Sequence, residues 1–365
     1  MSRLRTTLVE DVLAKLPEAC KLDDASAPRH VDLFLCALGF EPRCLSVPKE
    51  LGRLAVKVSH GCYLEPSTNR SDNRANLPAL TGYLEGFCTS LGSLQSDDLE
   101  FPERLRQLVI SAGKGRSGPA VVALDISVLA NRALMRVLKV LLESDVDLTV
   151  AYAEAEVYHP TREEYRDHPE VWRSENALGL ERGVADVGPS REYPGQHLDP
   201  LPDFLILFPS FRADRTRAII ARVDLSLRTV PAGKVVWLIG VPHLRDNRWR
   251  ADAMRELNGI SATAPQYDVS TFEYKEVLQR LHAIHGEHEQ EFNITVSPLG
   301  SKLQALATAL FCYMHPDVRV MFAIPKEYNA ARYSQGCAAM WLFGFGNTAS
   351  LRQSLESVGS LWIEE

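Results

Sequence analysis

Residues 293–311 read NITVSPLGSKLQALATALF, and this stretch predicts a buried strand, a short loop and a helix. The run NITVSP has the length of a buried strand, and the residues from Lys302 onward are apolar at helical spacing. In the loop opened by Ser297, Gly300 permits close backbone approach, Ser301 can cap the helix and offer a hydroxyl, and Lys302 falls in the first turn. Backbone N–H groups at a helix N-terminus together with a cation can hold a phosphate or carboxylate. The loop therefore predicts an anion site, with a capped helix whose lysine points to solvent as the alternative.

Other apolar stretches have the same form and end at polar junctions: VDLFLCALG, PAVVALD, DLTVAYAEAEVY, DFLILFPSF, KVVWLIGVP and VRVMFAIP. Helical patterns such as NRALMRVLKVLLESDV and RWRADAMRELNG lie between most of them. Apolar strands alternating with helices predict an α/β protein with a mostly parallel, doubly wound (Rossmann-like) sheet. Ligands bind at the carboxyl ends of the strands in such sheets, so the junctions are the places to look for a site.

The composition is that of an ordinary globular protein. The chain has 365 residues, of which 45% are hydrophobic and 24% charged, and its formal net charge is −7. No apolar run approaches the roughly 20 residues that span a bilayer, and residues 1–16 predict an amphipathic helix, so we expect a cytoplasmic protein with no membrane partner. The seven cysteines include no CxxC pair and lie mostly in apolar segments, which indicates buried, reduced thiols. The negative charge excludes a global basic field, so phosphate contacts need local cations.

The chain is expected to contain two α/β halves, residues 1–152 and 204–365, with the second half carrying the quoted loop. Between them, residues 153–203 are rich in charge, Pro and Gly and have no strand pattern. This segment is either an insertion over the strand edge or a linker, and both one continuous sheet and two domains fit the pattern. The stretches LFLCALGFEPRCL and LILFPSFRADRTRAI share the order strand, Phe, Arg, helix, which is either an internal duplication or a chance likeness.

Further junction residues are candidates for ligand binding. An arginine can pair with phosphate, or with the acidic residue beside it. Aromatic and amide side chains after the last strand can stack on a base and read its edge, or pack as a turn. These candidates are Gly39, Phe40, Glu41, Arg43, Tyr328 and Asn329.

Three carboxylates are candidates for chemistry. Asp125, followed by Ser127, closes a strand and can take a ribose hydroxyl, orient a water, hold a metal or cap the next helix. Glu154 and Glu156 are expected on one face of one strand, as a metal-binding or acid/base pair or as a solvated strand end. Asp125 and Glu154 are the candidate catalytic residues, with Mg²⁺ as the cofactor if the protein is an enzyme.

Residues 293–310 also resemble the N-[IL]-T-x-G-T-K-x-M-A-x-A signature of CARF domains. The matching positions are Asn293-Ile294-Thr295, Gly300-Ser301-Lys302 and the apolar helix that follows. CARF domains are Rossmann-like sensor domains of prokaryotic antiviral effectors that bind cyclic oligonucleotides or other nucleotides. The resemblance implies that Ser301 and Lys302 contact ligand phosphate and that residues 39–43 form the opposite wall of the pocket.

Some motifs predict no site. Three histidines spaced three residues apart on one helix point in successively different directions around its axis, so no metal site is expected. An acidic D…E-x-K set resembles a nuclease core, but that core needs E-x-K on a strand and here the spacing is helical. A lysine in the stretch SAGKGRSGP precedes a strand instead of following one, so a flexible turn is expected there. These residues are His282, His285 and His288; Asp268, Glu273 and Lys275; and Lys114. The sequence contains no G-x-S-x-G, H-E-x-x-H or helix-opening G-x-G-x-x-G motif, which disfavours ordinary hydrolases and dehydrogenases.

The sequence therefore predicts a nucleotide-binding protein, a sensor or accessory component of a prokaryotic defence system. A phosphodiesterase or nucleotide hydrolase using the same strand-edge cleft is the alternative, and an interaction subunit with a vestigial cleft is a third. The expected partners are a nucleotide or cyclic oligonucleotide and the other proteins of a multi-subunit system, and a homodimer is compatible with the prediction.

Overall fold

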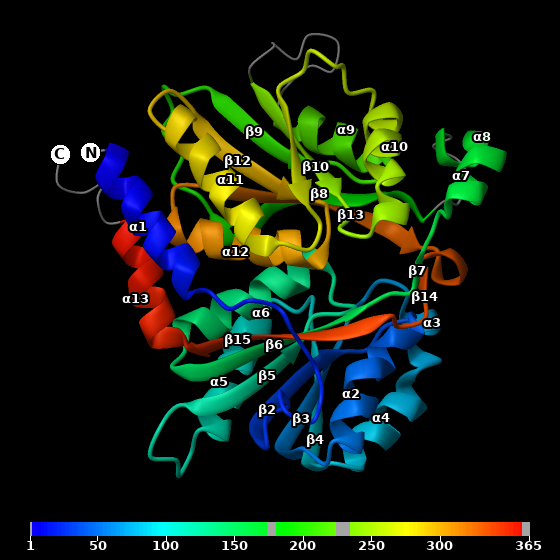
Figure 1. The fold of residues 1–365 in the computed structure, drawn as a ribbon, viewed down its shortest axis with the longest axis vertical. Helices are drawn as coiled ribbons and strands as arrows, with labels where there is room; N and C mark the ends of the chain where they lie inside the picture. The colour runs from blue at the N-terminus through cyan, green and yellow to red at the C-terminus, as the bar shows by residue number, and fades with distance from the viewer. Residues whose placement is uncertain (1, 174–179, 224–233, 360–365) are drawn as a thin grey trace. The chain divides into compact units, whose positions relative to one another are not determined.

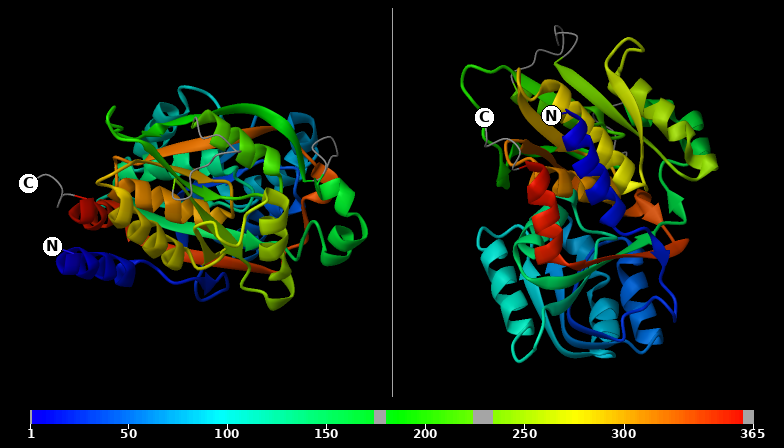
Figure 2. Two further views of the ribbon diagram at one scale, coloured as in Figure 1. Left: turned by 90° about the horizontal axis from the view of Figure 1, so that it is seen from above. Right: turned by 60° about the vertical axis from the view of Figure 1, so that its left-hand side comes forward.

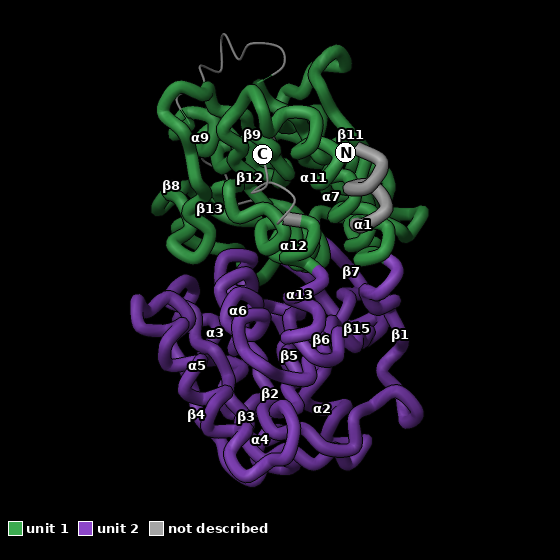
Figure 3. Tube along the Cα trace, turned by 90° about the vertical axis from the view of Figure 1, so that its left-hand side faces the viewer, with its two compact units in different colours: residues 1–13, 160–332, 355–365 green, residues 14–159, 333–354 purple. Residues whose placement is uncertain are grey.

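Two distinct, mostly parallel sheets with helices between their strands form the protein (Figure 1). The structure is a computed structural model that describes residues 2–173, 180–223 and 234–359. The predicted α/β class is confirmed, and the question of one sheet or two is answered in favour of two. The chain divides into unit 1, residues 1–13, 160–332 and 355–365, and unit 2, residues 14–159 and 333–354 (Figure 3).

Unit 2 contains a seven-stranded sheet with the order β1-β15-β6-β5-β2-β3-β4. Strands β2 to β6 run parallel, whereas β15 and β1 are antiparallel to their neighbours. The strands are β1 (Cys20–Lys21), β2 (His30–Ala37), β3 (Lys57–Glu65), β4 (Cys88–Gln95), β5 (Ala120–Asp125), β6 (Val146–Glu154) and β15 (Ala339–Asn347). The helices between the parallel strands are α2 (Ser46–Arg53), α3 (Arg70–Arg74), α4 (Leu77–Glu85), α5 (Phe101–Ala112) and α6 (Asn131–Glu143).

Unit 1 contains a six-stranded sheet with the order β11-β10-β9-β12-β13-β8. All neighbours are parallel except β8, which is antiparallel to β13. The strands are β8 (Glu181–Pro194), β9 (Asp203–Phe208), β10 (Val235–Val241), β11 (Gln266–Ser270), β12 (Asn293–Pro298) and β13 (Arg319–Tyr328). The helices between them are α9 (Ala213–Arg222), α10 (Trp249–Asn258), α11 (Tyr274–His288) and α12 (Lys302–Met314).

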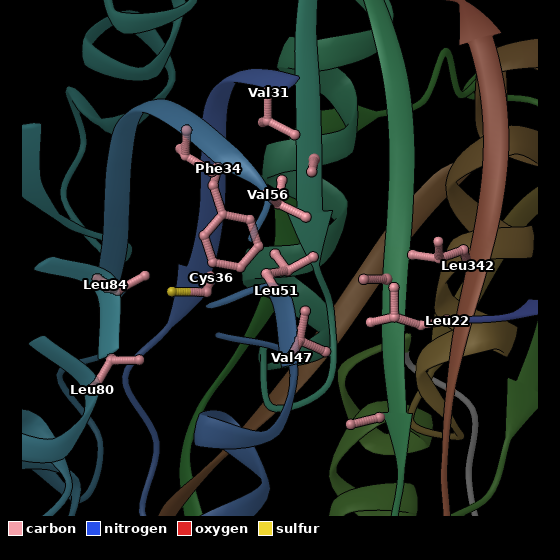
Figure 4. Packing of buried hydrophobic residues seen from close by; sticks show 14 of the residues in the cluster. Leu22, Val31, Phe34, Cys36, Val47, Leu51, Val56, Leu80, Leu84 and Leu342 are labelled. Carbon is pink, nitrogen blue, oxygen red and sulfur yellow. The ribbon is translucent and has the colours of Figure 1, made fainter. Parts of the chain in front are cut away.

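The core of unit 2 shows why apolar runs mark the parallel strands. Every residue of β2 except its first is buried, because helices cover both faces of a parallel sheet. On one face, Phe34 of β2 packs in a cluster with Leu51 of α2 and with Leu80 and Leu84 of α4 (Figure 4). Full burial of each such side chain contributes about 1.5–3 kcal/mol.

The two sheets repeat one topology. In each, the first parallel strand lies at the centre, the next two strands extend the sheet on one side, and the following two extend it on the other. The order of connection therefore reverses between β2 and β5 in unit 2 and between β9 and β12 in unit 1. These are the switch points at which doubly wound sheets bind ligands, beyond the carboxyl ends of the two strands.

The strand registers align the two units residue by residue. Neighbouring strands join Leu35, Leu124 and Val150 in unit 2, and Ile206, Val296 and Val320 in unit 1. Counting forward from these rows, Phe40 corresponds to Phe211 and Ala153 to Ala323. The two stretches that looked alike in sequence thus begin at equivalent strands, which favours duplication over chance.

Each unit also contains an edge strand that follows the other unit's last parallel strand. Strand β8 comes after β6 in the chain but pairs with β13, whereas β15 comes after β13 but pairs with β6. Both edge strands are antiparallel to the strand they cover. The strands of the unit 1 sheet, β8 to β13, are therefore consecutive in the chain, whereas the unit 2 sheet takes β15 from beyond them.

Residues 153–203 contain regular structure that their sequence did not predict. They include β7 (Val157–Tyr158), α7 (Arg162–Asp167), α8 (Pro169–Arg173) and the strand β8, while residues 174–179 lie outside the described part. Strand β7 pairs with β14 (Ser334–Gln335). The remaining helices are α1 (Ser2–Lys15) and α13 (Thr348–Gly359), which Figure 2 shows from two further sides. Among the described residues, no helix is both long and apolar enough to cross a bilayer.

Candidate functional site

The candidate residues divide between the carboxyl edges of the two sheets, here called the unit 1 edge and the unit 2 edge. The unit 1 edge carries Ser297, Gly300, Ser301, Lys302, Tyr328 and Asn329. The unit 2 edge carries Gly39, Phe40, Glu41, Arg43, Asp125 and Ser127. Each group lies where strands of one sheet end.

The loop 299–301 of the unit 1 edge connects β12 to α12 at the switch point of its sheet. Ser301 is the N-cap of α12, as predicted, and forms a capping box with Gln304: the Gln304 N–H donates to Ser301 Oγ over 3.2 Å, and the Ser301 N–H donates to Gln304 Oε1 over 2.9 Å. A Cβ on Gly300 would lie 2.0 Å from Gln304 Oε1. The glycine is therefore required by the capping side chain. The sequence pattern S-x-x-Q carried this signal.

The Ser301 hydroxyl has structural partners at both of its functions. It accepts the Gln304 N–H and donates to the Thr271 carbonyl, over 2.7 Å, just beyond β11. Ser297 is fully buried within β12. The Ser301 hydroxyl is thus engaged within the fold, whereas the buried Ser297 hydroxyl makes no hydrogen bond with the described residues. Lys302, at the first position of α12, is half-buried.

The end of β13 supplies the remaining candidates of the unit 1 edge. Tyr328 is the last residue of the strand and is half-buried. Asn329 is buried, and its backbone N–H donates to the Leu180 carbonyl over 2.8 Å. Asn329 therefore anchors the chain as it leaves the sheet.

At the unit 2 edge, Asp125 and Ser127 join the ends of β5 and β6. The backbone N–H and the hydroxyl of Ser127 both donate to Asp125 Oδ1, and the Ser127 hydroxyl accepts the Ala153 N–H over 2.7 Å. Burial raises the pKa of Asp125 to about 6, against the lowering effect of the Ser127 hydrogen bonds and of the Arg43 charge. The alternative of a helix cap is wrong, because α6 begins at Asn131 with no side-chain cap.

Glu41 and Arg43 form a buried ion pair beside this carboxylate. Arg43 Nε donates to Glu41 Oε2 over 2.9 Å, and Arg43 Nη1 donates to the Ala153 carbonyl over 3.0 Å. The Ser334 hydroxyl also donates to Glu41. The side chains of both members of the pair are 4–6% exposed, so the structure has the salt bridge that sequence analysis kept as the alternative to phosphate binding.

The first residues of this loop are held by packing and by an amide. The Asn76 side chain donates to the carbonyls of Gly39 and Phe40 over 2.8 and 3.1 Å. The Phe40 ring meets the Tyr333 ring edge-on, with centroids 5.7 Å apart. Tyr333 therefore packs against this loop.

The expected carboxylate pair Glu154 and Glu156 does not share a strand. Strand β6 ends at Glu154, whose carboxylate accepts the Trp341 indole N–H over 3.1 Å, and Glu156 lies beyond the strand end. The expectation of two carboxylates on one strand face is wrong for this reason.

The arginines of the two duplicated stretches make equivalent contacts. Arg215 Nε donates to the Ala323 carbonyl over 2.9 Å, at the position that corresponds to the Ala153 carbonyl bound by Arg43. Arg215 also pairs with Glu181 over 3.0 Å. In both units an arginine beyond the central strand, buried in the case of Arg43 and half-buried in the case of Arg215, thus connects to the fifth parallel strand, a structural role.

The two edges differ in charge. At the unit 2 edge every parallel strand ends in, or is soon followed by, a carboxylate: Glu41, Glu65, Asp97, Asp125 and Glu154. At the unit 1 edge β9, β10 and β12 are followed by Arg212, Arg245 and Lys302, of which Arg212 is buried and pairs with Asp214 over 3.2 Å. Of the two edges, that of unit 1 suits an anion better.

The motifs for which no site was predicted lie on β11, on α11 and before β5. Asp268 lies on β11, Glu273 is the N-cap of α11 and Lys275 lies within that helix, so the E-x-K part is not on a strand, as predicted. His288 stacks on Phe204 with centroids 4.1 Å apart, whereas His285 lies against residues that follow α12. Lys114 precedes β5, as predicted.

Comparisons with known proteins give no family. No family model and no curated protein matches the chain. Among solved structures, a functionally unknown protein from Pseudomonas aeruginosa matches 91% of this chain and 98% of its own length, at 10% identity and a TM-score of 0.23. A similarity at that TM-score carries no argument about function.

Proposed function

We propose that this protein binds the phosphate of a nucleotide at the unit 1 edge, with Lys302 as the charged contact. The observation that carries the proposal is the position of the loop 299–301: it joins β12 to α12 at the switch point of the six-stranded sheet, next to β9. Doubly wound sheets bind nucleotides at such a point.

Electrostatics favour an anion there. The N-terminus of α12 carries a partial positive charge, so a lysine in its first turn is unfavourable for the isolated helix and favourable once an anion neutralises both. Arg245 follows β10 on the same edge. The carboxylates of the unit 2 edge would repel a phosphate, so the proposal is confined to unit 1.

The hydrogen bonds of the loop separate the residues that shape it from the residue proposed to contact the ligand. Because the Ser301 hydroxyl is used by Thr271 and Gln304, we assign Ser301 and Gly300 to shaping the loop, and Lys302 to the ligand. Tyr328, half-buried at the end of β13, is the aromatic residue of this edge that could stack on a base. The CARF resemblance of residues 293–310 extends the proposal to a cyclic oligonucleotide as ligand and to a sensor role in prokaryotic defence.

One observation favours a second candidate, a phosphodiesterase or nucleotide hydrolase acting at the unit 2 edge, where a bound Mg²⁺ would have to offset the repulsion between the carboxylates and a phosphate. Asp125, with its pKa raised to about 6, is suited to exchange a proton near neutral pH. Its hydrogen bonds with Ser127 and its burial support a structural role equally, so binding remains the primary proposal.

The test is thermal unfolding of the full chain with nucleotides, dinucleotides and cyclic oligonucleotides, with and without Mg²⁺. A ligand at 100 times its Kd adds about 2.7 kcal/mol of stability. Lys302→Ala should weaken binding by about 1–3 kcal/mol, a factor of roughly 5 to 150 in Kd. The control is Lys57→Ala, an exposed lysine at the start of β3 in unit 2, which should leave the affinity unchanged.

The outcomes separate the candidates. A stabilising ligand whose affinity falls in Lys302→Ala and not in Lys57→Ala supports the proposed site. An equal affinity in Lys302→Ala removes this lysine from the site, and no stabilisation by any nucleotide refutes nucleotide binding. Breakdown products in the same samples, absent with Asp125→Asn, would support the hydrolase.

A further inference from the structure

Two buried histidines and an aspartate meet at the opposite, amino-terminal edge of the unit 1 sheet. His285 is near the end of α11, which leads into β12, and His315 and Asp317 lie between α12 and β13. The helices α11 and α12 pack against each other (Figure 1), which brings the three residues together. The histidine spacing on α11 predicted no metal site, and it could not reveal this cluster because the cluster's members come from two segments of the chain.

The distances fit a single ion. One ligand atom from each of the three residues lies within 4.8 Å of the others. His285 Nε2 is 2.9 Å from Asp317 Oδ2, and the rings of His285 and His315 have centroids 3.9 Å apart. Ligand atoms bound tetrahedrally to Zn²⁺ at about 2.0–2.2 Å lie about 3.3 Å from one another. Small side-chain rotations therefore convert the cluster into a coordination sphere.

Both imidazole rings have an outer group that orients them. Glu289 Oε2 lies 2.8 Å from His285 Nδ1, and His282 Nδ1 lies 3.0 Å from His315 Nε2. Outer carboxylates and hydrogen-bonding groups fix the tautomer of a metal-bound histidine in this way. The remaining nitrogens, Nε2 of His285 and Nδ1 of His315, are then the ones assigned to the metal.

The backbone holds the turn between α12 and β13 in place. The His315 N–H donates to the Phe311 carbonyl over 2.9 Å, and the Val318 N–H donates to the His315 carbonyl over 3.1 Å. The Asp317 carbonyl accepts the Gln196 N–H over 2.9 Å. The ligands are thus largely pre-positioned, which lowers the cost of ordering them on binding.

The histidine side of the cluster is buried, and the aspartate side faces solvent. His285 and His315 are each 1% exposed, whereas the Asp317 side chain is 45% exposed. An ion can enter on the aspartate side, and a water can complete a four-coordinate sphere there.

We propose that His285, His315 and Asp317 bind a divalent cation of the Zn²⁺ class. Two imidazoles and a carboxylate suit this class of ion better than Mg²⁺ or Ca²⁺, which prefer all-oxygen sites. Since the cluster lies away from the carboxyl edge, its role is to fasten α11 to the turn before β13. The same contacts can hold a protonated His285 between two carboxylates without any metal, and a metal titration distinguishes the two.

The experiment uses the full chain, stripped with a chelator and titrated with Zn²⁺ and with Co²⁺. We expect one equivalent of Zn²⁺ to raise the unfolding temperature. Co²⁺ should give the visible absorption of a tetrahedral site without the near-ultraviolet charge-transfer band of thiolate ligands, which excludes the cysteines. Binding of both ions should be lost in His315→Gln and Asp317→Ala.

Two further variants sharpen the test. Glu289→Gln should lower the affinity for Zn²⁺ by about 10- to 100-fold, as loss of an outer group does. His168→Gln, which changes a histidine 66% exposed in unit 1, should leave it unchanged. Because Asp317 is half-exposed, its variant should fold even if His315→Gln does not. The proposal is overturned if the stripped chain binds no Zn²⁺, if binding survives in Asp317→Ala, or if the thiolate band appears.

Discussion

Replacing Asp125 with asparagine should change how the stability of unit 2 depends on pH. Burial raises the pKa of this carboxyl from the ordinary 3.8 to about 6. Asparagine keeps an oxygen that can accept the two Ser127 hydrogen bonds and removes the ionisation. The variant therefore isolates the free energy of ionising a buried group.

The sign and size follow from the two pKa values. Below pH 3.8 the carboxyl is protonated in both the folded and the unfolded chain, and it costs nothing. Between about pH 4 and pH 6 the unfolded chain loses the proton while the folded chain keeps it, so the free energy of unfolding falls as the pH rises. Above pH 6 both states are ionised and the loss is constant. At 1.36 kcal/mol per pH unit, the total is about 3 kcal/mol.

Hydrogen exchange of the β2 and β5 amides, followed by mass spectrometry between pH 4 and pH 7, measures the opening of unit 2 separately from that of unit 1. The free energy of opening of the natural chain minus that of Asp125→Asn should fall by about 3 kcal/mol over this range. A difference that is independent of pH would mean that Asp125 titrates normally. A difference that rises with pH would mean that the Arg43 charge outweighs burial, and either result would remove the basis for the hydrolase candidate.

Two further predictions concern the loop 299–301 and the strand β15. Gly300→Ala should destabilise unit 1 by about 1 kcal/mol in hydrogen exchange of α12, because the new Cβ displaces the capping glutamine; Gly286→Ala, in α11 with open space around it, should not, and equal effects of the two would contradict this account. The fragment 14–159 lacks β15, so β6 is left as an uncovered edge and the fragment should aggregate. Fusing residues 333–354, which contain β15, to the fragment through a flexible linker should restore a monomer in light scattering. A fragment without these residues that is monomeric and unfolds cooperatively would refute the need for β15.

The sequence predicted the strands that are buried on both faces and missed those with weak patterns. All seven apolar stretches are strands, because burial under helices on both faces demands continuous apolar residues. Strand β4 was missed because none of its residues is buried, β3 because only part of it is buried, and β15 because glycines interrupt its apolar pattern. The sequence pattern also did not show that β15 pairs with β6, since local periodicity carries no information about pairing between distant segments.

For the candidate site, the sequence located the loops but not the partners of their side chains. The cap at Ser301 was predictable from its neighbours, whereas its bond to Thr271 joins residues far apart in the chain. The same holds for Ser334 and Glu41. Long-range contacts of this kind decide which polar side chains are already engaged within the protein, and local sequence patterns do not show them.

The aligned registers suggest how the two edges came to differ. In both units an arginine binds a carbonyl of the fifth parallel strand, as Arg43 and Arg215, although Arg215 lies one residue beyond the position that corresponds to Arg43 by register. The residues after the fourth parallel strand have changed. By register Asp125 corresponds to Ser297, so one unit has a carboxylate where the other has a hydroxyl, followed by a glycine loop and Lys302. In the proposed function this change favours an anion in unit 1 over unit 2, so a duplicated binding edge would be expected to retain its phosphate site in only one copy.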